Sequence, residues 1–332
     1  MNKLIFKLFY WKAAFVALLI ILLSGCAPKI TGSIVEKIPK ETADEQRVYF
    51  CPGEDCGKVF ESYIKSANFS VHCAFYDINL KNIITSLAKK SKNADVRLVM
   101  DTSNYKEQIK GDGIKLNNGG QLMHNKFCIF DDSVVITGSF NPTENDNYYN
   151  NNNIMVIYSN ALAKNYEDEF NELWNGQFGK GLNVEHPVLY VNNKKIENYF
   201  CPEDKCASHI IDLIKDAKSS VYFMAFSFTN EEIADAIIAK NGVDIRGIFD
   251  SQQSSGEFSQ FKRMLEFGIN VKKDKNKYKM HHKVFIIDNE TVVTGSFNPT
   301  LSADSKNDEN LLIVHDKKIA NYFLREFDRI WP

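Results

Sequence analysis

Hydrophobic and polar positions along residues 47–176 switch repeatedly between the period of a strand and the period of a helix. Short apolar runs bounded by turn residues predict buried strands, and apolar positions three or four apart predict amphipathic helices. The predicted strands lie near Val48–Phe50, Val71–Phe75, Val96–Asp101, Lys126–Phe130, Val134–Thr137 and Asn153–Tyr158, and the predicted helices near Lys58–Ala67, Leu80–Lys90 and Leu162–Trp174. This alternation predicts an α/β fold with a mixed or parallel sheet covered by helices.

The second half of the chain repeats the first. The segment that begins at Tyr49 returns at Tyr199, and the strand that ends at Asp101 returns as a strand that ends at Asp250. The offset grows from about 150 to 157 because the second copy carries eight extra residues before His281. A period this long excludes a solenoid, whose units span about 20 to 50 residues, and indicates a duplicated domain. We expect repeat 1 over residues 47–176, a linker over 177–187, and repeat 2 over 188–332.

The first 25 residues differ from the rest and predict an export signal. Lysines precede an apolar run of eleven residues, Ala13–Leu23, which is too short to span a bilayer comfortably. The run ends in Leu-Ser-Gly-Cys, which resembles a bacterial lipobox, so Cys26 is the expected lipidation site. An ordinary cleaved signal or an N-terminal membrane anchor is the alternative. Residues 26–46 are polar and predict a tether. We therefore expect an exported, membrane-anchored lipoprotein at the periplasmic face or the cell surface.

Composition leaves the partner open. The chain has 332 residues, 44% of them hydrophobic, which suits one large domain or two of ordinary size. A net charge of -2 excludes a surface that coats DNA through bulk charge. Six lysines lie within residues 272–283 and form either a solvated loop or a guide for an anionic substrate. In the same region Phe258, Phe261 and Phe267 follow a helical pattern and predict core positions rather than a membrane wedge.

Ionisable side chains recur in both copies at identical spacing. The pattern H-x-K-x4-D-x6-G-S-x-N begins at His124 in repeat 1 and at His281 in repeat 2. Side chains two apart on a strand share a face, so each histidine is presented together with a lysine. A two-fold pairing of the copies brings six such side chains to one pocket: His124, Lys126, Asn141, His281, Lys283 and Asn298. They suit a phosphodiester, because lysines and amides bind its oxygens while two histidines divide attack and proton transfer.

The repeated pattern resembles the H-x-K-x4-D signature of the phospholipase D superfamily, and the resemblance covers the chain after residue 46. It implies two homologous phospholipase D-like α/β domains packed about a pseudo-two-fold axis. It also implies phosphodiester hydrolysis without a metal or other cofactor, through a phosphohistidine intermediate. The aspartates of the signature, Asp131 and Asp288, are usually structural hydrogen-bond acceptors in this superfamily.

The superfamily acts on both phospholipids and nucleic acids, so the resemblance fixes the reaction more closely than the substrate. We expect a phospholipid substrate, because a membrane tether and a negative net charge favour it. A nuclease that cleaves DNA or RNA is the alternative, and a non-catalytic binder of anionic polymers is a third reading. We expect the protein to be active as a monomer.

The two copies differ at one position of the expected site. Eleven residues after Asn298 lies Glu309, where the superfamily commonly has an acidic residue that orients a catalytic histidine, and repeat 1 has Asn152 there. An amide can accept a hydrogen bond from imidazole, but it does not stabilise imidazolium as a carboxylate does. If the acidic partner acts across the repeats, as the resemblance suggests, Glu309 serves His124. His124 is then the expected nucleophile, and His281 the general acid and base.

Cysteines form two C-x4-C pairs, one at the start of each repeat. Cys51 with Cys56 and Cys201 with Cys206 predict two short-loop disulfides, with one zinc ion held by all four as the alternative. Cys73 and Cys128 align with large apolar residues in repeat 2 and predict small buried hydrophobic side chains.

Overall fold

The computed structural model describes residues 38–105, 109 and 111–332. The predicted export signal, Cys26 and most of the predicted tether therefore lie outside the described residues. Within the described part of the tether, β1 (Lys40–Glu41) pairs in parallel with β9 (Val188–Val191). None of the helices that the structure describes is long and apolar enough to cross a membrane.

Repeat 1 forms the strands and helices that its hydrophobic pattern predicts, together with a short strand, β5, and a short helix, α4. Its elements are β2 (Arg47–Cys51), α2 (Cys56–Ser66), β3 (Ser70–Phe75), α3 (Lys81–Lys90), β4 (Asp95–Met100), β5 (Ile114–Leu116), β6 (Lys126–Phe130), β7 (Val134–Gly138), α4 (Glu144–Tyr148), β8 (Asn152–Tyr158) and α5 (Asn160–Trp174). The strands form one sheet in the order β2-β8-β7-β6-β3-β4-β5.

Repeat 2 has the same order of elements, and its extra residues form a short helix before β13. Its elements are β10 (Lys194–Cys201), α6 (Cys206–Asp216), β11 (Ser220–Ala225), α7 (Glu231–Ala239), β12 (Asp244–Phe249), η1 (Gln253–Ser255), α8 (Phe261–Glu266), β13 (Asn270–Lys273), β14 (Lys283–Ile287), β15 (Thr291–Gly295), α9 (Leu301–Ser305), β16 (Glu309–His315) and α10 (Lys317–Ile330). The sheet order β10-β16-β15-β14-β11-β12-β13 matches that of repeat 1 strand for strand, with β9 and β1 added at the edge.

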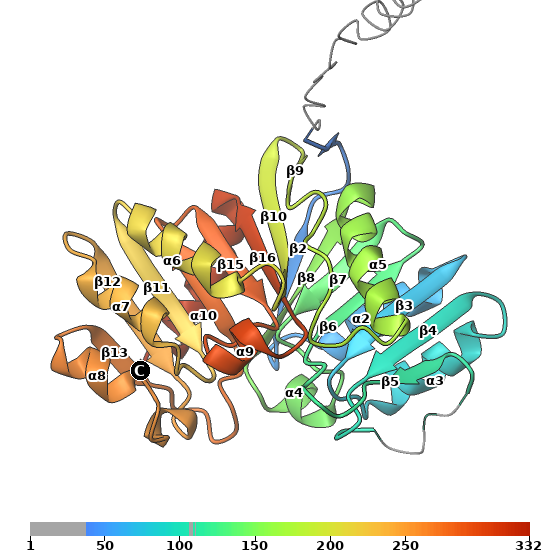
Figure 1. The fold of residues 1–332 in the computed structure, drawn as a ribbon, viewed down its shortest axis with the longest axis horizontal. Helices are drawn as coiled ribbons and strands as arrows, with labels where there is room; N and C mark the ends of the chain where they lie inside the picture. Colours follow the sequence, from blue (N-terminus) through green and yellow to red (C-terminus); the bar gives the residue numbers. More distant parts are fainter. Residues whose placement is uncertain (1–37, 106–108, 110) are drawn as a thin grey trace, which may run out of the picture. The chain divides into compact units, whose positions relative to one another are not determined.

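The two sheets lie beside each other with β2 and β8 of one next to β10 and β16 of the other (Figure 1). Equivalent aromatic pairs join the repeats. Phe50 on β2 packs edge-on against Phe323 on α10 with ring centroids 5.1 Å apart, and Phe200 on β10 packs against Tyr166 on α5 at 5.0 Å. Because each pair repeats the other with the roles of the copies exchanged, the repeats are related by a pseudo-two-fold axis.

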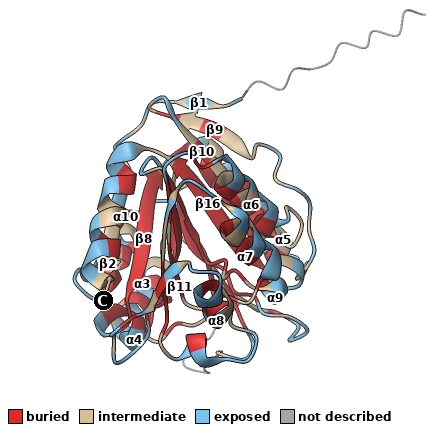
Figure 2. Ribbon diagram, turned by 90° about the vertical axis from the view of Figure 1, so that its left-hand side faces the viewer, coloured by how far each residue is buried: buried red, intermediate tan, exposed pale blue. Residues whose placement is uncertain are grey.

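Three hydrophobic clusters form the core. The largest spans both repeats and includes side chains of α5 and α10, whereas the other two lie within single repeats, under α2 and α3 and under α6 and α7. The central strands are buried and the helices expose their outer faces (Figure 2). The shared cluster means that neither repeat buries its own apolar surface alone.

The expectation for the phenylalanines of repeat 2 is wrong at two of three positions. Phe261 is buried at 9% exposure, but Phe258 and Phe267 are 74% and 61% exposed. Phe258 precedes α8 and Phe267 follows it, so a helix of six residues is too short to turn all three rings inward.

Disulfides join Cys51 to Cys56 and Cys201 to Cys206, the pairing that the C-x4-C spacing favours. A third disulfide joins Cys73 to Cys128, so the expectation that these two act only as small hydrophobic side chains is wrong. Both are buried, but they face each other on the adjacent strands β3 and β6.

Candidate active site

The two histidines of the repeated pattern precede equivalent strands, β6 and β14, and each is held by backbone of the other repeat. The His124 N–H donates to the carbonyl of Asp308 at 2.9 Å, and the His281 N–H donates to the carbonyl of Asn151 at 2.8 Å. Asp308 and Asn151 directly precede β16 and β8. The pseudo-two-fold axis thus brings the starts of four central strands together, beside α4 and α9 (Figure 1).

Glu309, the first residue of β16, reaches across to His124. Its Oε2 lies 2.8 Å from His124 Nδ1, and the Ser296 hydroxyl donates to the same oxygen at 2.6 Å. Both Glu309 and His124 are buried. A carboxylate only accepts, so Nδ1 carries the proton and Nε2 of His124 has its lone pair available.

Asn152 occupies the equivalent place beside His281. Its Oδ1 lies 2.8 Å from His281 Nδ1 and accepts from the Ser139 hydroxyl at 3.2 Å. The Asn152 Nδ2 donates to the carbonyls of Asp146 and Asn150, at 3.3 and 3.4 Å, which fixes which way the amide points. His281 therefore also carries its proton on Nδ1 and has Nε2 available, but its partner is neutral.

The two lysines of the pattern are almost fully buried, at 1% exposure for Lys126 and 2% for Lys283. Each Nζ donates to the carbonyl of the histidine two residues before it, at 2.6 and 2.8 Å. Burial lowers the pKa of Lys126 to about 8 and that of Lys283 well below its usual value. The charge of Lys126 lowers the pKa of Lys283 further, so the two ammonium groups lie close enough to repel each other.

Aromatic rings flank the histidines. Tyr76 lies edge-on to His124 with centroids 4.8 Å apart, and Phe226, its counterpart in repeat 2, lies edge-on to His281 at 4.7 Å. Lys126 Nζ lies 5.1 Å from the Tyr76 ring centroid, and Lys283 Nζ lies 5.0 Å from that of Phe226. Each ring therefore stabilises the charge of the neighbouring ammonium through cation–π attraction.

The histidines differ in their electrostatic surroundings. Burial lowers the pKa of His124, and the Glu309 carboxylate opposes that shift. Burial lowers the pKa of His281 well below its usual value, and the positive charges of Lys283 and Lys126 lower it further. The pKa of both imidazoles is thus lowered, and that of His281 more strongly.

Asn141 and Asn298, the remaining residues of the expected site, follow strands β7 and β15. The backbone N–H and Nδ2 of Asn141 both donate to Asp146 Oδ2, at 2.8 and 2.9 Å. The glycine three residues earlier allows close approach of two strands. A Cβ on Gly138, whose φ is +149°, would lie 2.2 Å from the carbonyl oxygen of Asn153. A Cβ on Gly295 would lie 2.3 Å from the equivalent carbonyl oxygen, that of Asn310.

Asp131 and Asp288, the aspartates of the signature, lie at the other ends of β6 and β14. Asp131 accepts hydrogen bonds from three successive backbone N–H groups, those of Asn68, Phe69 and Ser70, and Asp288 accepts three in the equivalent loop of repeat 2. They tie the turn after each histidine-bearing strand to the start of the neighbouring strand, which is a structural role.

Asp146 is a site residue that the sequence comparison misses. It lies in the first turn of α4, and its Oδ2 is 3.6 Å from His281 Nδ1. Its position in repeat 2 is occupied by Ala303, so it does not belong to the repeated pattern. A search for acidic residues near the pattern in one copy and not the other would have found it.

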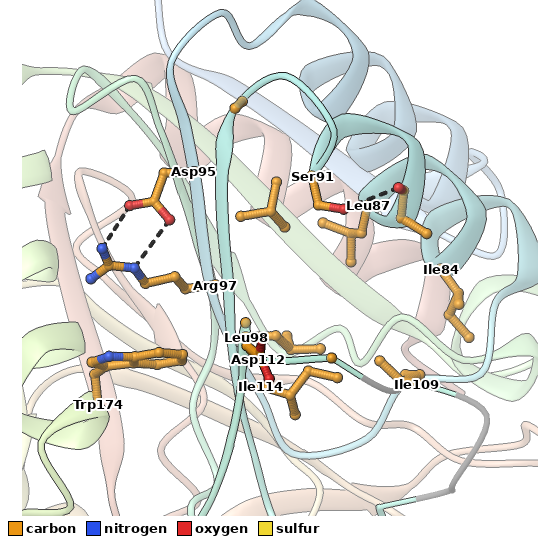
Figure 3. Close-up of a pocket in the computed structure, with 15 residues that line it drawn as sticks. Ile84, Leu87, Ser91, Asp95, Arg97, Leu98, Ile109, Asp112, Ile114 and Trp174 are labelled. Carbon is orange, nitrogen blue, oxygen red and sulfur yellow. Dashed lines mark hydrogen bonds and ion pairs between the residues drawn. The ribbon is translucent and has the colours of Figure 1, made fainter.

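Two hollows of similar volume differ in their relation to the site. One, of about 480 Å³, lies beside the His124 loop between Gly119–Leu122 of repeat 1 and the α9 region of repeat 2, including Lys306. The other, also about 480 Å³, lies on the outer edge of repeat 1 between α3, β4 and Trp174 (Figure 3). The second contains none of the motif residues, and its Asp95 and Arg97 pair with each other at 2.8 Å. Among the described residues, no group of His, Cys, Asp or Glu side chains is arranged to hold a metal ion.

Comparisons with known proteins agree with this arrangement. A family model described as "Cardiolipin synthase, PLD-like domain" matches residues 60–174 and 210–331, once in each repeat. A phospholipase D of Rickettsia prowazekii (strain Madrid E) is 32% identical over 144 residues, which are 43% of this chain and 70% of that protein. A mitochondrial cardiolipin hydrolase of Xenopus tropicalis is 32% identical over 150 residues, 44% of this chain and 70% of that protein.

Solved structures match this chain over different lengths. The phospholipase D family member Nuc from Salmonella typhimurium is 34% identical, with a TM-score of 0.40, over 42% of this chain and 94% of its own. The phosphatidylserine synthase of Haemophilus influenzae Rd KW20 covers 85% of both chains with a TM-score of 0.64 at 13% identity, a likeness of fold alone. With a family-model match in each repeat and the H-x-K pattern repeated at one shared site, the chain belongs to the family of phospholipase D-like domains.

Proposed function

We propose that this chain is a phospholipase D-type phosphodiesterase that hydrolyses phospholipids through a phosphohistidine. The observation that carries the proposal is the reciprocal support of the two histidines. Glu309 of repeat 2 holds His124 of repeat 1, and Asn152 of repeat 1 holds His281 of repeat 2, both at 2.8 Å. Support of this kind leaves both Nε2 atoms available to one phosphorus between them.

The reaction divides into two displacements. Nε2 of His124 attacks phosphorus, the bond to the leaving oxygen breaks, and protonated His281 gives its proton to that oxygen. His281 then takes a proton from water, the resulting hydroxide attacks phosphorus, and the bond to His124 breaks. Lys126 and Lys283 bind the non-bridging oxygens with help from Asn141 and Asn298. His124 is the nucleophile because its carboxylate partner supports positive charge on the ring.

Substrate charge has a direct part in this scheme. Burial and mutual repulsion lower the pKa of Lys283 and of His281 in the free site. An anionic diester bound between them offsets the repulsion and raises both pKa values, so that His281 is protonated when it is needed as an acid. The site is therefore electrostatically complementary to a phosphodiester rather than to a neutral ester.

A phospholipid is favoured by the surface on one side of the site. Tyr149, beyond α4, stacks on Tyr278 of repeat 2 with centroids 4.5 Å apart, and Tyr148 lies beside them; all three are exposed. Exposed lysines flank Tyr278 in the segment that leads to His281: Lys275, Lys277 and Lys279. Tyrosines and lysines together are typical of surfaces that contact anionic membranes. The names of the phospholipase D and cardiolipin hydrolase relatives also support a phospholipid.

A nuclease is the second candidate, because exposed stacked tyrosines beside lysines also suit the bases and backbone of a single strand. The anchor and the assembly complete the proposal. We infer a lipid anchor at Cys26 from the lipobox-like segment, and hence an exported protein at the periplasmic face or the cell surface. We infer a functional monomer because one chain carries both halves of the site.

The test compares substrates under identical conditions. Purified protein with excess chelator is assayed on vesicles of phosphatidylglycerol and phosphatidylcholine, on cardiolipin vesicles, and on single-stranded and duplex DNA. Release of headgroup from vesicles is the expected result, together with a labelled histidine that is kept at high pH because phosphohistidine hydrolyses in acid. Cleavage of DNA with intact vesicles would establish the nuclease, and cleavage of neither, with no labelled histidine, would leave only the binding role.

Two variants link the assay to the surface beside the site. Tyr149→Ser and Tyr278→Ser should reduce turnover of vesicles severalfold and leave hydrolysis of the small diester bis(4-nitrophenyl) phosphate within about twofold. Phe258→Ser is the control, since Phe258 is also an exposed aromatic residue but belongs to the α8 region. An equal loss on both substrates would refute the membrane-contact role of the tyrosines.

A further inference from the structure

A buried carboxylate near His281 has no equivalent in the other repeat. Asp146, at 4% exposure, lies where repeat 2 has Ala303, and six residues later repeat 1 has Asn152 where repeat 2 has Glu309. Of these two equivalent positions, repeat 1 has its acidic residue at the first and repeat 2 at the second. The difference is an exchange rather than a loss of the carboxylate from repeat 1.

Neutral groups fill the hydrogen bonds of Asp146. Its Oδ2 accepts from the backbone N–H and Nδ2 of Asn141 at 2.8 and 2.9 Å, and its Oδ1 accepts from Nδ2 of Asn150 at 2.6 Å. Among the described residues its one ion-pair contact is to His281 Nδ1, at 3.6 Å from Oδ2. Amides orient the carboxylate without neutralising it, so its charge acts on the groups that surround it.

The surrounding groups are mostly cationic. Lys283 and Lys279 from the segment of His281, Lys126 from β6 and His124 all lower the pKa of His281 through their charges. The charge of Asp146 raises the pKa of both Lys126 and Lys283, as does that of Glu309. Two buried carboxylates, one from each repeat, therefore act on both buried lysines, and Asp101 and Asp77 also raise the pKa of Lys126.

We propose that Asp146 is the acidic partner of His281, acting on the same ring nitrogen as the neutral Asn152 but from a longer distance. Asn152 orients the ring and fixes its tautomer, and Asp146 supplies the charge that stabilises the imidazolium form during proton transfer. In repeat 2 a single residue, Glu309, does both for His124. Asp146 is a positioning residue, since it also accepts two hydrogen bonds from Asn141. This inference rests on the proposed two-histidine reaction.

The division has a chemical advantage for an acid that must release its proton. A carboxylate hydrogen-bonded to Nδ1 would hold the imidazolium strongly, whereas one at 3.6 Å, with an amide as the hydrogen-bond partner of Nδ1, stabilises it less. His281 can then protonate the leaving oxygen in the first displacement and take a proton from water in the second. The nucleophile, which keeps positive character throughout the intermediate, has the direct contact instead.

The experiment measures kcat against pH with bis(4-nitrophenyl) phosphate for the parent, for Asp146→Asn, and for the double variant Asp146→Ala with Asn152→Glu. The double variant gives repeat 1 the pattern of repeat 2. Loss of a charge at this distance depresses the pKa of an acid by about one unit or more. Asp146→Asn should therefore lower kcat roughly tenfold to a hundredfold and move the alkaline limb of the profile to lower pH by about one unit. The double variant should restore kcat to within about fivefold and return the limb to the parent pH or above it.

Glu144→Gln is the matched control, because Glu144 lies in the same helical turn but is exposed. It should leave both kcat and the profile unchanged. An alkaline limb that does not move in Asp146→Asn would overturn the proposal, even with a reduced kcat, since a structural role predicts that result. If Asp146→Asn does not fold, the double variant decides alone: an active protein with the parent profile supports the exchange, and an inactive folded one refutes it. A parent protein that hydrolyses no diester would instead refute the proposed function.

Discussion

Glu309→Gln changes one charge at the site and almost nothing else. His124 Nδ1 and the Ser296 hydroxyl both donate to Glu309 Oε2, at 2.8 and 2.6 Å. The equivalent oxygen in repeat 1, Oδ1 of Asn152, already accepts from His281 and a serine in the same way. An amide oxygen therefore suits this geometry, and glutamine should keep the orientation and tautomer of His124 while it removes the carboxylate charge.

The size of the effect follows from distance and burial. Two unit charges 2.8 Å apart interact by about 6 kcal/mol at an effective dielectric constant of 20, which is an upper limit for the contact between Glu309 and imidazolium. The hydrogen bond from His124 to the neutral amide offsets about 1 kcal/mol of this loss, and relaxation of the site offsets more. We expect a net loss of roughly 2 to 4 kcal/mol in the first displacement, or about 30- to 900-fold in its rate.

The direction of the pKa shift gives a second signature. The Glu309 carboxylate raises the pKa of His124 against the effect of burial, so its removal lowers that pKa. The acid limb of kcat/KM, which reports protonation of the free nucleophile, should then move to lower pH. A less basic imidazole attacks more slowly but leaves phosphorus more readily. Formation of the phosphoenzyme should consequently slow more than its breakdown.

Rapid-quench kinetics with mass mapping of the phosphorylated residue tests the loss of rate and the larger effect on formation of the phosphoenzyme. The pH profile of kcat/KM tests the shift of the acid limb. Glu326→Gln is the control, because the buried Glu326 carboxylate contacts a different histidine, His282, at 3.1 Å. Neither residue belongs to the H-x-K pattern. This control variant should reduce stability without a selective effect on phosphoenzyme formation. Phosphate on His281, or equal slowing of both steps in Glu309→Gln, would refute the assignment of His124 as nucleophile.

Three further outcomes are expected. His124→Ala and His281→Ala should each lower kcat by several orders of magnitude. The activity of the parent protein should survive excess chelator. Full loss of activity with chelator, restored by a divalent ion, would exclude the two-histidine reaction. Cys26→Ser should abolish lipid attachment, and membrane retention of that variant after salt washing would contradict the lipoprotein hypothesis. Gly138→Ala should lower the melting temperature markedly, because the new Cβ would lie 2.2 Å from the carbonyl oxygen of Asn153. An unchanged melting temperature would show that β7 can move away from β8.

Local pattern and internal repetition predict most of the fold. The strands and helices of repeat 1 agree with their hydrophobic periods to within a residue or two, and duplication predicts that the copies share one sheet order. Short elements escape this reasoning: β5 has three residues and α4 has five, too few for a period to appear. The exposure of Phe258 and Phe267 escapes it as well, because a helical pattern does not show where the helix ends.

Features that depend on three-dimensional neighbours are the ones that sequence comparison misses. Cys73 and Cys128 are 55 residues apart, and only the adjacency of β3 and β6 makes them partners. Asp146 is missed for a different reason. A repeat highlights what both copies share, so nothing in the sequence separates a carboxylate present in one copy alone from an ordinary helix residue. Only the position of α4 next to His281 does so.

The fusion of two phospholipase D-like domains into one chain has a consequence for how the site can evolve. In a dimer of identical subunits, any substitution near one histidine appears near both, so both must remain compatible with attack and with proton transfer. Here Glu309 and Asn152, and likewise Ala303 and Asp146, are encoded separately. A change that improves a nucleophile need not weaken an acid. Covalent linkage thus frees each histidine to specialise, and the unequal neighbours of His124 and His281 are the form that such specialisation takes.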